Sequence, residues 1–321
     1  MQMAERYVPF NVSALKAIAA KSVGRQGMTE FKKLAEGGFN RIFLFTLNDG
    51  FEIIAKVLYY SIVPKHWTTE SEVATLDFLS SKDIPVPRVY AWSSEKENAV
   101  GSEYMVFEKA PGQSLASRWQ DLGQNKIVRL VSSFVEIEKK MFSFPLGAYG
   151  SLYYRGRALP SHLEVDLYEP ESRDESGDGS RFCIGPATDS SFWDGKRAQL
   201  NLDRGPCQSL LLQQVMSRPV TIDLTLPTGT DPHQYLCSVG QREREWTRKF
   251  GKPRANKFPR IFIVKGEVSL ESYLDLWKKY LCLAPHILPP DRGHPLNRPT
   301  LRHPGNPHPQ KLTINVKHTP H

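Results

Sequence analysis

Cysteine is scarce in this 321-residue sequence, and long apolar runs are missing from it. The four cysteines, Cys183, Cys207, Cys237 and Cys282, lie far apart and form no Cys-x-x-Cys pair. This spacing argues against a zinc module or a disulfide scaffold and fits a reducing compartment. No apolar stretch approaches the ~20 residues that a membrane-spanning helix needs. We therefore expect a globular protein without a transmembrane segment.

Charge of one sign does not dominate either, because the sequence carries 42 basic and 34 acidic residues, for a net charge of +8. Basic and acidic residues are interleaved, as in the run QRERE at 241–245. We interpret that run as a solvated helix face, so a nucleic-acid role is not supported. The modest positive charge indicates no more than a mild preference for anionic ligands.

The first 29 residues allow two interpretations. They contain four basic residues and the single acid Glu5, a composition that resembles a mitochondrial presequence. Alternatively, Asn11 caps a folded helix whose inward positions are Val12, Leu15, Ile18 and Ala19. The predicted location therefore stays open between the cytoplasm and the mitochondrion.

The segment from Phe31 to Lys56 has the pattern of three antiparallel strands. A Gly37-Gly38 turn follows the first strand, and Asn48-Asp49-Gly50 is a hairpin signal because these residue types tolerate positive φ. Backbone N–H groups in a glycine turn can approach phosphate oxygens with no Cβ in the way, and a lysine supplies a point charge. The segment is typical of a phosphate site, although a two-glycine turn and a lysine at a strand end are also common elsewhere.

A helix is predicted next, over 68–79, with Val73, Leu76 and either Leu79 or Phe78 on its buried side. Two roles for Glu72 fit the pattern. It could form a capping box with Thr69, in which both side chains satisfy free N–H groups of the first turn. It could instead pair with Lys56 and hold that lysine toward phosphates.

Two further strands and a long helix complete the first half of the chain. The strands are predicted at 88–92 and 103–108, and Pro111-Gly112 then breaks the pattern. An amphipathic helix follows over 124–142, because its apolar residues recur at helical spacing. These apolar residues are Ile127, Leu130, Val131, Phe134, Ile137 and Met141.

Taken together, several short motifs resemble the aminoglycoside phosphotransferase family, and most of all its fungal branch with altered-inheritance-of-mitochondria type proteins. The resemblance covers roughly residues 8 to 303 and implies a protein-kinase-like α+β fold with two lobes: a five-stranded antiparallel N-lobe sheet with one helix, and an incomplete, mainly helical C-lobe. The motifs that carry it are LAEGGFNR at 34–41, Ala55-Lys56, SEVA at 71–74, IPVP at 84–87, EKAPG at 108–112, GAYGSLYY at 147–154, FWDG at 192–195 and LDRGP at 202–206.

The resemblance also implies roles for individual residues. It makes Gly37, Gly38, Phe39 and Asn40 a phosphate-covering loop, and it makes Lys56 the contact to the α- and β-phosphates of ATP. Glu72 becomes the ion-pair partner of that lysine. The backbone of Glu108, Lys109 and Ala110 becomes the hinge that hydrogen-bonds adenine.

The catalytic segment of the family is not matched. That segment has the form His-x-Asp-x-x-x-x-Asn, in which Asp is the base and Asn binds Mg²⁺, and a second Asp follows later. Here His303 is followed by Pro304 and Gly305, and glycine cannot accept a proton. The sequence contains no acidic residue after Asp291. The resemblance therefore implies ATP as cofactor and Mg²⁺ for the family, but no catalytic or metal-binding residue is found in this chain.

Four other segments give expectations about structure and none about catalysis. The acidic stretch at 166–178 is interpreted as a solvated loop, and the Pro-rich tail with His303 and His308 as irregular chain rather than a metal site. Residues 208–231 interrupt the resemblance as if inserted. On the helix expected over 269–284, the apolar face is expected to lack cover and to attract a protein partner. That face consists of Leu270, Leu274, Trp277 and Leu281.

The predicted domains are an N-terminal helix or extension (1–29), a kinase-like N-lobe and hinge (30–112), a partial helical C-lobe (113–297) with an insertion at about 155–260, and an irregular tail (298–321). The predicted function is ATP-dependent phosphoryl transfer to a small-molecule hydroxyl, with this chain truncated and impaired in catalysis. The alternative is a non-catalytic nucleotide-binding protein or interaction remnant, or a fragment without stable function. The acceptor molecule is not specified by the sequence.

Overall fold

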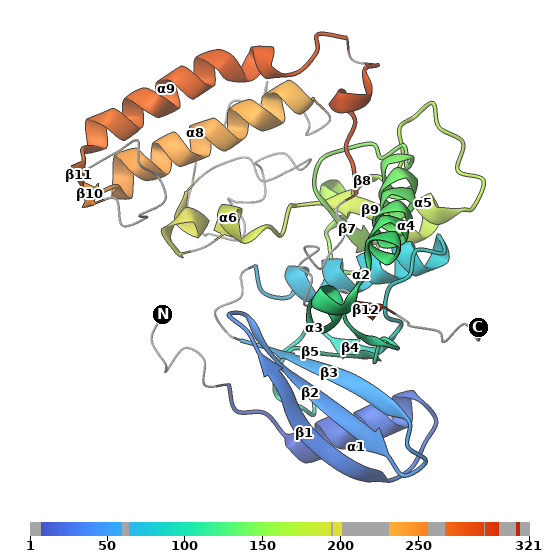
Figure 1. Ribbon diagram of the computed structural model, residues 1–321. Coiled ribbons are helices and arrows are strands. Elements are labelled where there is room, and N and C mark those ends of the chain that lie inside the picture. The colour runs from blue at the N-terminus through green and yellow to red at the C-terminus, as the bar shows by residue number, and fades with distance from the viewer. Residues whose placement is uncertain are drawn as a thin grey trace. The chain divides into compact units, whose positions relative to one another are not determined.

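The computed structural model describes residues 8–59, 64–193, 195–200, 231–255, 267–291, 293–301 and 313–314 (Figure 1). The chain divides into two compact units. The N-terminal unit comprises Met1–Phe144, Leu152–Tyr154 and Thr300–His321, and the C-terminal unit comprises Pro145–Ser151 and Arg155–Pro299.

A five-stranded antiparallel sheet forms the centre of the N-terminal unit. Its strand order is β1-β2-β3-β5-β4 (Figure 1). The predicted α+β class, with five antiparallel strands in the first part of the chain, is confirmed. The strands are β1 (Met28–Glu36), β2 (Asn40–Leu47), β3 (Glu52–Leu58), β4 (Val89–Ser93) and β5 (Tyr104–Glu108).

Helix α1 (Val12–Ser22) covers one face of this sheet. The Asn11 side chain accepts a hydrogen bond of 3.0 Å from the Ala14 N–H, so the predicted cap is present. Leu15 and Ala19 are fully buried in one cluster with apolar side chains of all the inner strands. Burying a leucine side chain in this way contributes about 1.5–3 kcal/mol. Helix α1 is therefore an integral layer of the unit.

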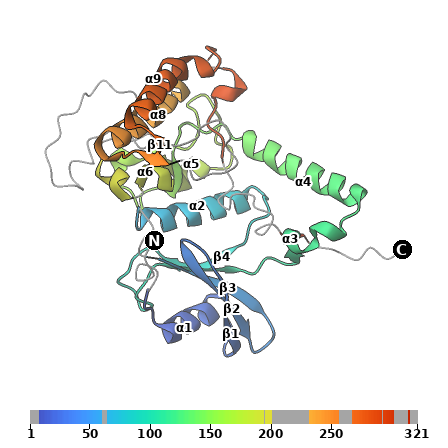
Figure 2. The same ribbon diagram turned by 60° about the vertical axis from the view of Figure 1, so that its left-hand side comes forward.

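Helix α2 (Trp67–Ser81) covers the opposite face, and Figure 2 shows α1 and α2 on either side of the sheet. In a strand, successive side chains point to opposite faces. Ile53, Ala55 and Val57 of β3 lie in the α1 cluster, so Ile54 and Lys56 point toward α2. The register of β3 thus places Lys56 on the helix-α2 side.

The hairpin signal between β2 and β3 is also confirmed. Gly50 has φ +81°, a left-handed conformation that favours glycine, and its N–H donates to the Leu47 carbonyl at 2.9 Å. The Asp49 carboxylate accepts from the Phe51 N–H at 3.1 Å and pairs with Arg25 at 2.9 Å. The turn therefore fixes the register that places Lys56.

The predicted long helix is present as α4 (Gln124–Phe142), preceded by β6 (Gln113–Ser114), α3 (Leu115–Arg118) and a 3-10 turn (Trp119–Asp121). Strand β6 pairs with β12 (Thr313–Ile314). Only Met141 of α4 is buried, in a cluster with Leu79 and Ile84. Most of the apolar stripe on α4 is half-buried or exposed in the described parts of the chain.

The rest of the described chain is built from short strands and two long helices. Strands β7, β9 and β8 form one small sheet in that order, and β10 pairs with β11. The elements are β7 (Ser151–Tyr154), η3 (Ser161–Leu163), β8 (Val165–Asp166), α5 (Asp178–Arg181), β9 (Phe182–Gly185), α6 (Ser190–Trp193), η4 (Gly195–Gln199), α8 (Pro232–Phe250), β10 (Arg254–Ala255), β11 (Glu267–Val268), α9 (Leu270–Ile287) and η5 (Pro295–Asn297).

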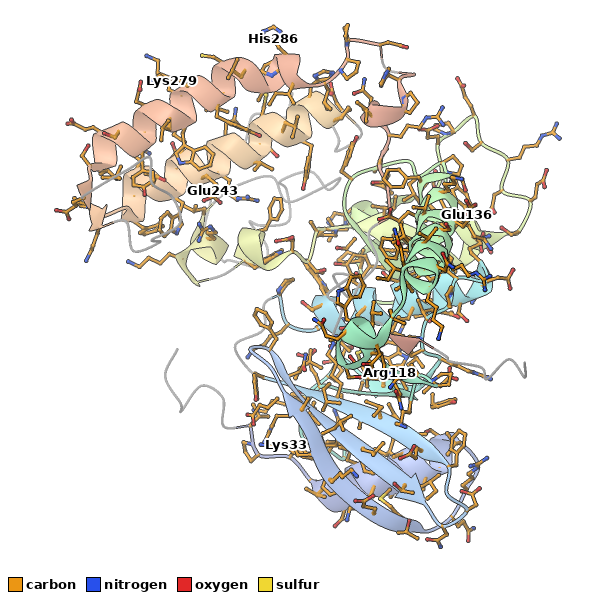
Figure 3. The ribbon with its side chains drawn as sticks, viewed as in Figure 1. Lys33, Arg118, Glu136, Glu243, Lys279 and His286 are labelled. Atoms are coloured by element: carbon orange, nitrogen blue, oxygen red, sulfur yellow. The ribbon has the colours of Figure 1, made fainter. Side chains whose placement is uncertain are left out.

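Helices α8 and α9 lie side by side, and the face of α9 that was expected to lack cover is the one that packs on α8. The Tyr280 hydroxyl donates to the Leu236 carbonyl of α8 at 3.1 Å, and a Cβ added at Gly240 would lie 2.5 Å from the Tyr280 ring. Lys279 and His286 project from the far side of α9 (Figure 3). The expectation was wrong because α8 supplies the cover. The large exposed side chains of α9 are instead Tyr273, Leu276, Leu283 and Ile287.

Gly240→Ala is expected to lower the free energy of unfolding by about 1–2 kcal/mol. Alanine gains about 1 kcal/mol of helix propensity over glycine, but the added methyl would meet the Tyr280 ring, and overpacking costs about 1–3 kcal/mol. Urea denaturation measures the difference. In a Tyr280→Ala background the same substitution should cost less, because only the contact with Leu281, at 2.9 Å, remains. A stabilised Gly240→Ala single variant would contradict the close approach of α8 and α9.

Candidate functional site

The centre of the candidate site is an ion pair between β3 and α2. Lys56 Nζ lies 2.6 Å from Oε1 and 2.5 Å from Oε2 of Glu72, so the carboxylate accepts through both oxygens. The Lys56 side chain is 13% exposed and the Glu72 side chain 26% exposed. Partly desolvated charges of this kind attract one another more strongly than exposed ones. The structure thus contains the second of the two arrangements that the sequence allowed for Glu72.

The capping box proposed for Thr69 and Glu72 is absent. Helix α2 begins at Trp67, its N-cap is His66, and no side chain caps it there. Thr69 therefore lies within the first turn, and its hydroxyl donates to Glu103 Oε2 at 2.6 Å. The prediction failed because the helix starts earlier than the Thr-x-x-Glu spacing indicates. This frees Glu72 for Lys56.

The glycine turn lies at the same end of the sheet as Lys56. The Gly37 N–H donates to the Asn40 carbonyl at 3.0 Å, and the Tyr59 N–H donates to the Phe39 carbonyl at 3.0 Å. Tyr59 follows the last residue of β3, so this bond links the turn to the strand that carries Lys56. Half of the Phe39 side-chain surface is exposed.

The backbone conformations at Gly37 and Gly38 do not require glycine. Positive φ is found at other glycines but not at Gly37 or Gly38. A Cβ at Gly38 would meet nothing within 4 Å, and one at Gly37 would touch only Asn40 at ordinary distance. The space above the turn is therefore open to whatever approaches it.

The predicted hinge begins at Glu108, the last residue of strand β5, and continues with Lys109 and Ala110. The Glu108 N–H donates to the Arg88 carbonyl at 2.8 Å, and Glu108 Oε2 accepts from the Arg88 N–H at 3.2 Å. Lys109 Nζ pairs with Glu52 at 2.7 Å. The register of β3 with β5 ends at the pair Ile53–Glu108, so the Lys109 N–H faces the Glu52 carbonyl of β3. Among the described residues the Ala110 N–H has no protein acceptor, so this backbone donor is available to a ligand.

A group that the sequence interpretation missed holds the start of α2. Glu103 Oε1 accepts from the His66 N–H at 3.4 Å, while its other oxygen accepts from Thr69. Burial raises the pKa of the Glu103 carboxyl, and the bonds from Thr69 and His66 counteract part of that effect. No periodic or motif signal marks Glu103, because its role depends on a partner 34 residues away.

Arg41 lies on the α1 side of the sheet, away from Lys56. Its guanidinium stacks on Phe10 and Tyr59 and donates to the Val8 carbonyl. The Tyr59 hydroxyl in turn donates to Glu36 at 2.5 Å. The hydrogen bonds from Lys33 and Tyr59 lower the pKa of the Glu36 carboxyl. These contacts fasten the residue before the glycine turn and the N-terminal segment to the sheet.

Two charged segments that were interpreted as solvated are partly buried. In α8, Arg242 is 4% exposed and stacks on Phe192 at 3.9 Å. Glu243 accepts from Arg197 at 2.9 and 3.2 Å (Figure 3). Burial would raise the pKa of Glu243, but Arg197 and Arg242 outweigh burial and lower it. Compensation by paired charges explains why this face of α8 can be buried.

The acidic stretch at 166–178 also contains a carboxylate that is buried and hydrogen-bonded. Asp178 is 2% exposed and accepts from the Tyr168 hydroxyl at 2.9 Å. Asp174 accepts from the N–H groups of Asp178 and Gly179 at 3.0 and 2.7 Å. Burial and Asp178 together raise the pKa of Tyr168. These carboxylates stabilise a loop through hydrogen bonds. They are not arranged as a pair for acid–base catalysis.

The described parts of the chain contain no clustered set of metal ligands, and the buried cysteine Cys183 is not a reactive thiol. Among those residues, no group of three or more His, Cys, Asp or Glu side chains could hold a metal ion. Burial, with Glu164 nearby, raises the pKa of the Cys183 thiol to about 12, which leaves it unreactive. Gly305, His303, His308, Asp194 and Asp203 lie outside the described residues.

A lysine on the third strand, paired with a glutamate of the helix that follows and adjacent to a turn of the first hairpin, is the arrangement that protein kinases use around ATP phosphates. Together with the sheet order, this pair defines the N-terminal unit as kinase-like.

Sequence comparison finds relatives among fungal proteins. The chain is 33% identical over 285 residues to a subtelomeric hrmA-associated cluster protein of Aspergillus fumigatus, a match that covers 86% of this chain and 52% of that protein. It is 25% identical over 228 residues to altered inheritance of mitochondria protein 9, mitochondrial, of Yarrowia lipolytica, covering 65% and 39%. The resemblance to the fungal branch is thus confirmed. The chain spans about half the length of its Aspergillus relative.

Comparisons with family profiles and with solved structures do not strengthen the assignment. No protein-family profile matches the chain. A crystal structure of aminoglycoside phosphotransferase APH(4)-Ia has a TM-score of 0.30 at 17% identity, over 43% of each chain. A TM-score of this size does not establish a shared fold, so the assignment depends on the sheet order and on the Lys56–Glu72 pair.

The Yarrowia relative is named mitochondrial, whereas the location of this chain stays a prediction. In the described parts of the chain, no helix has the length and apolarity needed to span a lipid bilayer.

Proposed function

We propose that this protein is a phosphotransferase homologue whose N-terminal unit binds ATP, and that the 321-residue chain binds the nucleotide without transferring its phosphoryl group. The observation that carries this proposal is the ion pair of Lys56 with Glu72 at 2.6 Å. Glu72 holds the ammonium group near the glycine turn, where it can neutralise phosphate charge. ATP would supply the phosphoryl group in the full reaction of the family.

The surrounding residues fit the other parts of a nucleotide. Gly38 leaves open space above the turn, so its N–H group can approach phosphate oxygens closely, whereas the Gly37 N–H is already used by the Asn40 carbonyl. The exposed Phe39 ring lies at the tip of the same turn and would cover the phosphates. The backbone of Glu108, Lys109 and Ala110 would hydrogen-bond the adenine edge, with the Ala110 N–H as a donor.

The residues do not fit a catalytic Mg²⁺ site. Carboxylates are the ligands that Mg²⁺ needs beside ATP phosphates, and the sequence has no acidic residue after Asp291. The described residues also contain no cluster of candidate ligands. We therefore assign no metal-dependent step to this chain, and the acceptor substrate stays undefined.

Gly38→Ala tests the phosphate-binding role of the turn. A methyl group there meets no protein atom and the φ is not left-handed, so the free energy of unfolding should stay the same or rise by up to about 1 kcal/mol. The methyl would stand where phosphate oxygens approach, so ATP affinity should fall by about tenfold, or ~1.4 kcal/mol. Calorimetric titration and thermal denaturation measure the two effects separately.

Gly123→Ala is the matched control, because a Cβ at Gly123 also meets nothing within 4 Å and it lies in the same unit. It should leave ATP affinity unchanged. Equal affinity of Gly38→Ala and the parent protein would remove the turn from the site. Absence of ATP binding by the parent protein would overturn the proposed function itself.

A further inference from the structure

The start of helix α2 has an unusual backbone. His66, the N-cap residue, has φ +65° and ψ −60°. Apart from Asp83, it is the only non-glycine residue with positive φ in the described ranges. A residue with a Cβ pays a steric cost in this conformation, so surrounding contacts must hold it there.

Two carboxylates hold His66. Glu103 accepts its backbone N–H at 3.4 Å, and Glu95 lies 3.1 Å from the imidazole Nδ1. Glu103 also accepts the Thr69 hydroxyl at 2.6 Å, within the first turn of α2. Both oxygens of the Glu103 carboxylate are therefore engaged by the end of α2 that precedes Glu72.

The backbone of Glu103 is fixed to the strand that carries Lys56. The Leu58 N–H, two residues beyond Lys56, donates to the Glu103 carbonyl at 3.3 Å. A single residue thus connects the end of β3 through its carbonyl and the start of α2 through its side chain. These are the two elements whose relative position decides whether Glu72 reaches Lys56.

We propose that Glu103 is a positioning residue that holds α2 against β3 and thereby keeps Glu72 on Lys56. This inference rests on the proposed function, because its consequence is measured in nucleotide affinity. The Glu103 carboxylate is partly desolvated, and its hydrogen bonds replace lost water. Such a group holds its partners firmly, because losing a partner would leave a buried oxygen unsatisfied. The ionisable neighbours at this point are Lys65, His66 and Glu95.

Glu103→Gln tests the proposal. Glutamine keeps the size of the side chain but offers one acceptor oxygen in place of two, so either the Thr69 or the His66 bond is lost. ATP affinity should fall by about three- to tenfold, the effect of one hydrogen bond. Glu97→Gln, an exposed acid on the same β4–β5 connection, removes the same charge and should change nothing.

The decisive measurement repeats Glu103→Gln in a Glu72→Gln background. If Glu103 acts through Glu72, the second substitution lowers ATP affinity no further than Glu72→Gln alone. An equal loss in both backgrounds would show a merely structural role and would overturn the proposal, as would unchanged affinity of the Glu103→Gln single variant.

Hydrogen exchange separates this proposal from the proposed function. Without nucleotide, backbone amides at 69–72 should exchange faster in Glu103→Gln than in Glu97→Gln. Unchanged exchange there would overturn the positioning role even if ATP binds. If the parent protein does not bind ATP but exchange at 69–72 increases, the proposed function fails and the anchoring of α2 by Glu103 stands.

Discussion

Lys56→Ala is expected to lower ATP affinity by about a hundredfold or more. The substitution removes a charged donor to phosphate, worth about 1.5–3 kcal/mol, and it leaves Glu72 as an unpaired negative charge near the phosphates. The free energy of unfolding should fall as well, by about 1–3 kcal/mol, because the partly buried Glu72 carboxylate loses its ion-pair partner Lys56. Isothermal titration and denaturant unfolding measure these quantities.

The matched control is Lys32→Ala, on the edge strand β1 of the same sheet. Lys32 also pairs with an acid, Glu30 at 3.3 Å, but both side chains are 51% exposed. Exposed pairs contribute only about 0–1 kcal/mol, so stability and affinity should barely change. In a Lys56→Ala/Glu72→Ala double variant, stability should recover in part while affinity does not. Parent-like affinity of Lys56→Ala would remove Lys56 from the site.

ATP binding by the 321-residue chain is expected to be independent of Mg²⁺, with dissociation constants equal to within about twofold with and without the metal. Turnover on a panel of small alcohols and amines should not exceed the enzyme-free rate. The physical reason is that metal ligands and a base stabilise the charge that develops during phosphoryl transfer. No acidic residue after Asp291 can supply them.

Titration with ATP, then with ATP and Mg²⁺, followed by an ADP-release assay, tests this expectation. An active aminoglycoside phosphotransferase serves as the positive control for the assay. ADP release above background, or affinity that rises strongly with Mg²⁺, would show that other acidic residues replace the missing ones. Our interpretation of the segment after Asp291 would then be wrong.

The N-terminal sheet could be predicted because its signals are local. Strand alternation, the Asn48-Asp49-Gly50 turn and the Asn11 cap each follow from residues close together in sequence, and each is present. The position of Lys56 on the helix-α2 face follows from strand register. Among the candidate site residues, the Lys56–Glu72 pair is the part for which the sequence offered a specific geometry.

The remaining features depend on distant partners. Nothing near Thr69 in the sequence indicates that Glu103 would accept its hydroxyl, so local spacing predicted a capping box instead. Likewise, Glu243 accepts a hydrogen bond from Arg197, 46 residues away. Gly240 of α8 has no side chain, which allows Tyr280 of α9 to pack closely against it. Propensity and spacing cannot predict such contacts, because tertiary packing decides them.

The contacts of Val8, Phe10 and Arg41 limit how this chain can be processed. Phe10 packs on Phe43 with ring centroids 5.4 Å apart. Helix α1 covers Phe43 and Phe45 on the same face of the sheet. A protease that cut after α1 would uncover those aromatic side chains to water, and the remaining chain would aggregate. Removal of α1 is therefore expected to destabilise the sheet, whereas a cut before Val8 would leave these contacts in place.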